Sequence, residues 1–130
     1  MYSFNIHGHK NILGTHETTI EFTKDNYLTK AGDCILGINS EFILGKLKKF
    51  RNVSLIKIKI TIGGLEEEIV AKPYKKFKDS HELVIRKSNY KCDRTFAIQA
   101  DKASIDVDRR IIAKLQNPKS KAKITIKKMI

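Results

Sequence analysis

The sequence is poor in the residues that build metal clusters and membrane spans. It has no tryptophan and only two cysteines, Cys34 and Cys92, in 130 residues. Two cysteines cannot form a four-cysteine metal centre; they could form one disulfide, although a cytosol favours reduced thiols. Apolar runs are only a few residues long, so no membrane-spanning helix is expected. Residues 1–5 have neither the basic nor the apolar segment of a signal peptide, which predicts a soluble, cytoplasmic protein.

Glycine-rich nucleotide loops are also absent from the sequence. Gly32 and Gly37 have the spacing of a Walker loop, but the Lys-Ser/Thr pair that should follow is missing. No dinucleotide-binding glycine pattern occurs either. We therefore expect no cofactor, and charge and polar clusters become the guides to function.

Positive charge, by contrast, is in excess. The formal net charge is +12, from 26 Lys and Arg against 14 Asp and Glu. Residues 1–41 contain three lysines and five acidic residues, a net charge of −2, so residues 42–130 carry +14. A strongly basic surface favours an anionic partner such as RNA, DNA or a phosphate compound. A solvated lysine-rich surface without any partner explains the same charge equally well.

Apolar residues recur with the spacing of strands along most of the chain. The clearest case is residues 54–62, where isoleucines alternate with lysine and threonine. Two helical patterns interrupt the strands: one covers residues 43–50, and the other begins at Asp106, which can cap a helix over residues 107–115. Residues 24–31 form a polar connection with at most one helical turn. Strands are predicted at residues 3–7, 18–23, 34–38, 54–62, 66–72, 83–85, 95–99 and 121–128.

The order of predicted elements repeats within a single domain of residues 1–130. Residues 1–62 and 65–130 each read as a β-β-β-α-β unit, and residues 24–27 (K-D-N-Y) correspond to residues 87–90 (K-S-N-Y). A duplicated unit would pack about a pseudo-two-fold axis. Because strands outnumber helices and unpaired edge strands are a liability, we expect an α+β, mostly β fold that forms a closed or partly closed barrel with two helices. Identical residues are few, so chance similarity of the halves is the alternative.

Chemistry-bearing side chains are densest between residues 8 and 37. This segment holds two His, five Thr, two Glu, two Asp and Cys34. It reads G-H-x-N-I-x-x-T-H-x-T-T-x-E-x-T and then L-T-x-x-G-D-C-I-x-G, and this pattern resembles an uncharacterised archaeal family, domain of unknown function 371. Residues 86–90, 93–95 and 100–109 resemble the second half of the same family. The resemblance implies an archaeal source and a shared fold, and it implies no activity.

Two residues depart from the family pattern. Lys10 stands where the family usually has proline, which bears on the rigidity of that loop, and His7 lies outside the pattern. His7 and His9 share one strand face, and with His16 they would suit zinc with an open position. Their spacing matches no specific zinc motif, so no metal site is predicted.

The leading interpretation of the dense segment is a site for an anionic ligand, either RNA or a phosphate-bearing nucleotide or metabolite. Threonine hydroxyls, glycine amides and protonated histidines are groups that bind phosphate, and arginines of the second half could reach the same site. The threonines could instead reflect the strand propensity of a solvated face. The predicted ligand-binding residues are His9, Thr15, Thr18, Thr19, Arg86 and Arg94.

The alternative interpretation is a small hydrolase or transferase that acts on a phosphorylated metabolite. His16 would serve as the base and Glu21 as the orienting group or acid, with Asp33 as another candidate for that role. His16 could instead bond a backbone carbonyl within its loop. Cys34 opens an apolar run, which predicts a buried and inert thiol. In a third interpretation the segment is an assembly surface, and the oligomeric state stays open.

A second segment predicts contacts with nucleic acid. Lysines interleave with two aromatic residues, which is typical of surfaces where bases stack and phosphates pair. In the competing interpretation this is a solvated lysine loop whose aromatic rings turn into the core. The predicted surface consists of Lys72, Tyr74, Lys75, Lys76, Phe77 and Lys78.

Overall fold

The computed structural model describes residues 1–129, which contain eight strands, two α-helices and two 3-10 helices. The predicted class, α+β and mostly β, is confirmed. A helix long and apolar enough to cross a bilayer does not occur in residues 1–129. The strands are β1 (Tyr2–His7), β2 (Thr19–Thr23), β3 (Ile35–Gly37), β4 (Leu55–Ile62), β5 (Leu65–Pro73), β6 (Glu82–Arg86), β7 (Thr95–Ile98) and β8 (Lys121–Met129); the helices are α1 (Leu44–Leu47), η1 (Lys48–Phe50), η2 (Ser104–Asp106) and α2 (Arg109–Leu115).

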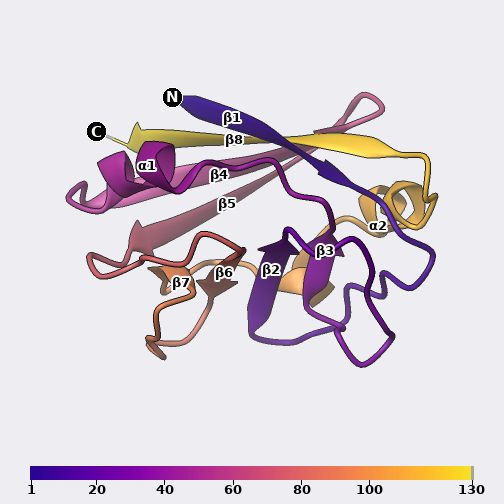
Figure 1. Ribbon diagram of the computed structural model, residues 1–130, viewed down its shortest axis with the longest axis horizontal. Coiled ribbons are helices and arrows are strands. Elements are labelled where there is room, and N and C mark those ends of the chain that lie inside the picture. The colour runs from indigo at the N-terminus through magenta and orange to yellow at the C-terminus, as the bar shows by residue number, and fades with distance from the viewer. Residues whose placement is uncertain (130) are drawn as a thin grey trace.

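The eight strands form one sheet in the order β1-β8-β4-β5-β7-β6-β2-β3. The long strands β1, β8, β4 and β5 pair antiparallel and form the upper layer of Figure 1. The short strands β7, β6, β2 and β3 form the lower layer, and the pairing of β5 with β7 joins the two groups. Within the lower layer β2 and β6 run antiparallel, and each also pairs in parallel with the next strand in sequence, β3 or β7.

The two outer strands of this sheet do not pair along a ladder. Between the ends of β1 and β3, His7 and Ile38 form an isolated bridge in which each N–H donates to the other's carbonyl at 2.9 Å. The sheet is therefore open, and the predicted closed or partly closed barrel is not confirmed. The predicted duplication of the halves stays a prediction.

The core lies between the two layers. All four isoleucines of β4 are buried, as the alternation of residues 54–62 predicts. Phe4 on β1 meets Phe22 on β2 edge-on at 6.2 Å between ring centroids, and it meets Phe42 at 5.6 Å. A third edge-on pair, Phe77 and Phe96 at 5.3 Å, fills the core beside β7. Such aromatic contacts add about 0.5–1.5 kcal/mol each beyond the area they bury.

The first helical pattern forms a shorter helix than predicted. α1 continues directly into η1, and Leu47 and Phe50 are buried on the predicted face. Ile43 is 59% exposed because it is the extended N-cap residue and lies outside the helical face. Residues 24–31 contain turns but no helical turn.

The second helix begins two residues later than predicted. Asp108, not Asp106, is the N-cap of α2, and its Oδ1 accepts the N–H of Arg110 at 2.8 Å. The carboxylate of Asp106 is already used, since its Oδ2 accepts the N–H of Ala103 at 2.9 Å in the preceding η2 turn. The predicted cap was therefore wrong because a local 3-10 turn competes for the same side chain.

Candidate functional site

The loop between β1 and β2 is fastened to the C-terminal end of α2. The N–H of Gly8 donates to the carbonyl of Ser120 at 3.1 Å, and that of His9 donates to the carbonyl of Leu115 at 2.9 Å. A Cβ on Gly8 would collide with the carbonyl oxygens of Leu115 and Asn117, so only glycine fits there. The Gly8 amide, which the anion-binding interpretation requires to be free, is thus engaged in the fold.

The two histidines of this loop order their own backbone. Nδ1 of His9 accepts the N–H of Asn11 at 3.0 Å, and Nδ1 of His16 accepts the N–H of Thr18 at 3.2 Å. An imidazole that accepts at Nδ1 carries its proton on Nε2 and is neutral in that state. These contacts are local turns of the kind that needs no ligand.

The threonines of the loop differ in exposure. Thr15 and Thr18 are exposed, whereas Thr19 on β2 is only 7% exposed. The hydroxyls of Thr18 and Thr19 lie 3.2 Å apart, and the N–H of Thr15 donates to the carbonyl of Asp33 at 3.1 Å. Their role as ligand-binding residues stays a prediction.

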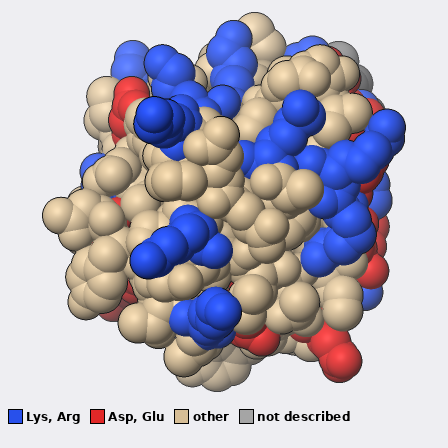
Figure 2. Space-filling model, turned by 90° about the vertical axis from the view of Figure 1, so that its right-hand side faces the viewer, with Lys and Arg blue, Asp and Glu red and all other residues tan. Residues whose placement is uncertain are grey.

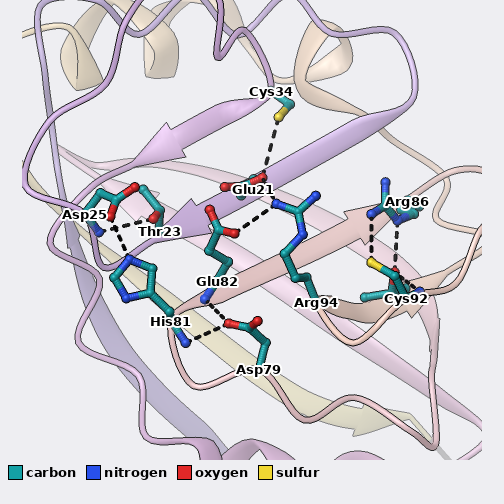
Figure 3. A network of polar contacts seen from close by, with 11 residues as sticks. Glu21, Thr23, Asp25, Cys34, Asp79, His81, Glu82, Arg86, Cys92 and Arg94 are labelled. Atoms are coloured by element: carbon teal, nitrogen blue, oxygen red, sulfur yellow. Dashed lines mark hydrogen bonds and ion pairs between the residues drawn. The ribbon is translucent and has the colours of Figure 1, made fainter.

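Glu21 lies in a buried polar cluster between β2 and β6 (Figure 3). Arg94 Nη1 lies 2.9 Å from Glu82 Oε1 and 3.7 Å from Glu21 Oε1, so one cation faces two carboxyl groups. Burial and then the bond and charge of Glu82 raise the pKa of Glu21 to about 8, although Arg94 and Arg86 oppose the shift. A carboxyl group with this pKa can give or take a proton at neutral pH.

His16 and Glu21, the predicted acid–base pair, are engaged with different partners. His16 bonds Thr18, and Glu21 lies beside Arg94 and Cys34. No hydrogen bond or ion pair joins His16 to Glu21 within the part of the chain that the structure describes. A direct His–Glu dyad is therefore not formed here, and a substrate would have to connect the two groups.

The two thiols lie in opposite environments. Burial, with smaller effects from Glu21 and Asp33, raises the pKa of Cys34 to about 12, so this half-buried thiol stays protonated. Burial would also raise the pKa of Cys92, but bonds from Thr95, from the Arg94 backbone and from Arg86 outweigh it and lower the pKa to about 7. Cys92 is thus the more reactive thiol of the two.

Arg86 is a structural support of that second thiol. Its Nε donates to Thr95 Oγ1 at 3.0 Å, and its Nη2 donates to Cys92 Sγ at 3.5 Å (Figure 3). Its guanidinium carbon also lies 4.8 Å from the ring centroid of Tyr90. Arg86 and Arg94 were predicted to reach a ligand from the second half; Arg94 does reach the first half, where it pairs with Glu21.

A cavity of about 560 Å³ lies where the basic segment of residues 72–78 meets the loop of residues 87–94. We call it the cationic cavity. An adjoining cavity of about 270 Å³ shares Tyr74, Lys75, Lys76 and Lys91 with it. The cationic cavity is lined by Lys48, Arg51, Tyr74, Lys75, Lys76, Lys78, Lys91, Cys92 and Asp93.

Hydrogen bonds to backbone carbonyls hold the basic segment in place. The N–H of Tyr74 donates to the carbonyl of Phe96 at 2.9 Å, and Arg51 Nη1 donates to the carbonyl of Phe77 at 3.3 Å. Phe77 itself is fully buried, so its prediction as an exposed stacking residue was wrong. The ring turns inward because its edge-on contact with Phe96 completes the core. Tyr74 is half-buried, and Lys72 lines the adjoining cavity.

Sequence reasoning missed three basic residues of the cationic cavity. Lys48 begins η1, Arg51 follows its last residue, and Lys91 comes from the loop before β7. Each stands in an ordinary lysine-rich stretch, and no spacing in the sequence links them to residues 72–78. The only signal in the sequence that could have indicated them is the net positive charge of residues 42–130.

Basic side chains are not confined to this cavity. On the face shown in Figure 2, which carries α2, Lys and Arg form several separate groups among uncharged residues. None of the cavities described here is lined by His9, His16 or the three threonines of the dense segment. Charge alone therefore does not define a site; the cationic cavity stands apart because six Lys and Arg side chains share its lining, against at most four in the other three cavities.

Two other histidines hydrogen-bond carboxyl groups at the surface. His7 Nε2 lies 2.7 Å from Glu41 Oε2, and His81 Nε2 lies 2.7 Å from Asp25 Oδ1. Across residues 1–129, no three His, Cys, Asp or Glu side chains converge in a way that could hold a metal ion.

The fold and the cationic cavity define a small, strongly basic, mostly β protein with a concave surface lined by Lys and Arg. The chain belongs to the family described as domain of unknown function DUF371, whose model matches residues 4–129. It is 40% identical, over 119 residues, to Uncharacterized protein MJ0206 of Methanocaldococcus jannaschii, covering 86% of this chain and 88% of that protein. The resemblance drawn from the dense segment is thereby confirmed. The family description names no activity, so function must be argued from the geometry.

Proposed function

We propose that the protein binds RNA through phosphate contacts in the cationic cavity. One observation carries the proposal: six Lys and Arg side chains line about 560 Å³ of concave surface, and Asp93 is the one carboxylate among the lining residues. Clustered like charges on a concave wall repel one another and raise the local concentration of anions. A phosphate chain would relieve that repulsion and release counterions on binding.

The adjoining cavity favours a polymer over a small phosphate compound. It shares Tyr74, Lys75, Lys76 and Lys91 with the cationic cavity and extends the surface past Lys72. Single-stranded nucleic acids are typically bound in grooves of this kind, where cations follow the backbone and aromatic rings meet the bases. Backbone bonds fix the basic segment, which limits the entropy lost on binding.

The proposal keeps the predicted partner and moves its site. The Thr/His motif holds its loop through local bonds, and it lines none of the cavities described above. Arg86 and Arg94 are engaged with Cys92 and the two glutamates. In this proposal they support the wall of the cavity instead of meeting phosphate directly.

A salt titration tests the proposal. Binding of a fluorescently labelled single-stranded RNA is measured by anisotropy from low to moderate salt. For single strands each phosphate contact contributes about 0.7 to the slope of log K against log salt, so the double variant Lys75→Ala/Lys76→Ala should flatten the slope by about 1.4. The matched control is Lys123→Ala/Lys127→Ala, which removes two exposed lysines of β8 that line none of the described cavities.

The two double variants remove the same net charge, so they separate a site from diffuse attraction. We expect the control to keep the wild-type slope within experimental error. Equal losses in both variants would mean that the protein attracts RNA only through its overall charge. Absence of binding by the wild type at low salt would refute the proposal.

A second candidate function is favoured by Glu21. Its pKa of about 8, beside Arg94, suits proton transfer in a hydrolase or transferase that acts on a phosphorylated metabolite. His16 would then act on the substrate from the neighbouring loop. Turnover of phosphorylated metabolites should fall in Glu21→Gln and His16→Ala while the circular dichroism spectrum is unchanged; a wild type without turnover removes this candidate.

We further infer that the two halves are a duplicated unit arranged as a partly closed barrel. Asn39 and Gln99, at corresponding positions, both have positive φ, 47° and 53°. The N–H of the next residue returns to the carbonyl of Thr23 in one half and Arg86 in the other, at 3.0 and 2.9 Å. The bridge between the ends of β1 and β3 supports partial closure. An experimental structure whose halves do not superpose with Asn39 on Gln99 would contradict this.

A further inference from the structure

Tyr90 presents an exposed aromatic ring next to the cationic cavity. The residue is 63% exposed, and the next two residues, Lys91 and Cys92, both line that cavity. The guanidinium carbon of Arg86 lies over the ring, 4.8 Å from its centroid. Single exposed aromatic residues are common, but this ring is held by a cation and lies beside a cationic cavity.

The support beneath the ring is fixed. Arg86 is held by Thr95 Oγ1 at 3.0 Å and by Cys92 Sγ at 3.5 Å, so its guanidinium links the cavity wall to the Tyr90 ring. The cation–π contact therefore holds Tyr90 in one orientation at little further entropic cost.

The loop that carries Tyr90 is also ordered. The Tyr90 N–H donates to Ser88 Oγ at 3.3 Å, and Gln99 Nε2 donates to Asn89 Oδ1 at 2.8 Å. The Gln99 N–H donates to the Ser88 carbonyl at 3.1 Å. The Cys92 N–H donates to Thr95 Oγ1 at 3.1 Å and holds the second end of the loop, so the aromatic ring is displayed from an ordered base beside the lysines.

We propose that Tyr90 is a stacking platform for an unpaired base of the RNA whose phosphates occupy the cationic cavity. The inference rests on the proposed function and narrows its ligand to single-stranded RNA. Bases of a duplex are stacked and paired inside the helix, so they cannot reach a side chain of this kind. A base that stacks on an ordered aromatic ring typically strengthens binding by on the order of tenfold, without sequence preference.

The chain offers a matched control for this ring. Tyr27 is also 63% exposed and ends the corresponding sequence K-D-N-Y, but no guanidinium–ring contact is found for it within residues 1–129. Anisotropy with a labelled single-stranded RNA would compare the variants Tyr90→Ala, Tyr90→Phe and Tyr27→Ala. Tyr90→Ala should bind on the order of tenfold more weakly, whereas Tyr90→Phe and Tyr27→Ala should bind within about twofold of the wild type.

Inorganic polyphosphate separates base stacking from phosphate contacts, because it carries the charge of RNA without bases. Tyr90→Ala should bind polyphosphate with the affinity of the wild type, whereas Lys75→Ala/Lys76→Ala should lose affinity for both polyphosphate and RNA. The salt slope of Tyr90→Ala should also match the wild type. Unchanged RNA affinity in Tyr90→Ala, equal binding of single-stranded and duplex RNA, or an equal loss for polyphosphate would overturn the inference while leaving RNA binding in place.

Discussion

The carboxyl groups of Glu21 and Glu82 share one guanidinium nitrogen. Nη1 of Arg94 lies 3.7 Å from Glu21 and 2.9 Å from Glu82. The Glu21 side chain is 8% exposed and that of Arg94 is 43% exposed, so the cation stays partly in water while the carboxyl group does not. Burial first, and then Glu82, raise the pKa of Glu21 to about 8. The folded pair thus keeps a proton at neutral pH that the unfolded chain has lost.

Because the folded state must lose this proton at high pH, we expect the protein to become less stable as pH rises. The pKa of Glu21 is about 8 in the folded state against an ordinary 4.5, so between these values the folded state binds more protons than the unfolded state. The Glu21 contribution is fully present at low pH and is lost as pH rises through about 8, by up to about 1.4 kcal/mol per pH unit. Glu21→Gln has no titrating group at this position. Its free energy of unfolding in urea, relative to that of the wild type, should therefore increase from about pH 5 to about pH 8.

The exposed Glu17 supplies the control for this measurement. Glu17→Gln should follow the wild-type stability curve at every pH, because an exposed carboxyl group has little differential interaction to lose. A constant offset between Glu21→Gln and the wild type across the whole range would show that Glu21 does not carry the proton.

Arg94→Ala should destabilise the protein more at high pH than at low pH. Without the cation, an ionised Glu21 faces Glu82 in a buried place, whereas at low pH both carboxyl groups can be protonated. We expect a loss of about 1–2 kcal/mol near pH 8, less than for a fully buried pair because Arg94 is partly exposed. Arg110→Ala is the control, since Arg110 is 72% exposed in its pair with Asp108. Equal losses at both pH values would contradict the argument.

Sequence periodicity predicted the strands well, because the alternation of buried and exposed side chains along a strand is visible in a short stretch of sequence. Residues 54–62 became β4 (Leu55–Ile62), and residues 121–128 became β8 (Lys121–Met129), each within one residue at either end. The sheet order was beyond the sequence, since β5 reaches β7 through only two residue pairs far apart in the chain. Whether a sheet closes depends on such sparse contacts between strand ends.

The density of chemistry-bearing side chains in residues 8–37 was a weaker guide to the site than periodicity was to the strands. The family motif of residues 8–16 fastens a loop to α2, and its glycine and histidines are used by the fold. The cationic cavity draws on η1, on residues 72–78 and on residues 91–93, which come together only in three dimensions. Arg94 was predicted to reach a ligand in the first half; it does reach that half, where it forms an ion pair with Glu21.

The role of the motif in the fold can be tested at its first glycine. Gly8→Ala should destabilise the protein by about 3 kcal/mol, because the new Cβ would collide with two backbone carbonyls that cannot rotate away. Gly45→Ala is the matched control: no atom lies within 4 Å of its added Cβ, and it lies in α1. It should be neutral or stabilise by up to about 1 kcal/mol. Similar urea midpoints for Gly8→Ala and the wild type would refute a structural role for Gly8.

The contrast between the two thiols gives the last prediction. With a pKa of about 7, Cys92 is about half thiolate at neutral pH, whereas Cys34, with a pKa of about 12, is almost entirely protonated. Iodoacetamide should therefore add one group near pH 7, and mass spectrometry of the digested protein should locate it at Cys92. The alkylation rate should rise through about pH 7 and then level off as the thiolate fraction saturates.

Cysteine variants and a bound polymer complete that experiment. Cys34→Ser should keep the fast alkylation and Cys92→Ser should lose it. Because Cys92 lines the cationic cavity, saturating RNA should slow its alkylation, while the Lys75→Ala/Lys76→Ala variant should lose this protection. Fast alkylation of Cys34 would contradict the assigned environments of the thiols. Fast alkylation of Cys92 that RNA leaves unchanged would instead place the bound polymer elsewhere on the protein, which separates the chemistry of the thiol from the site of binding.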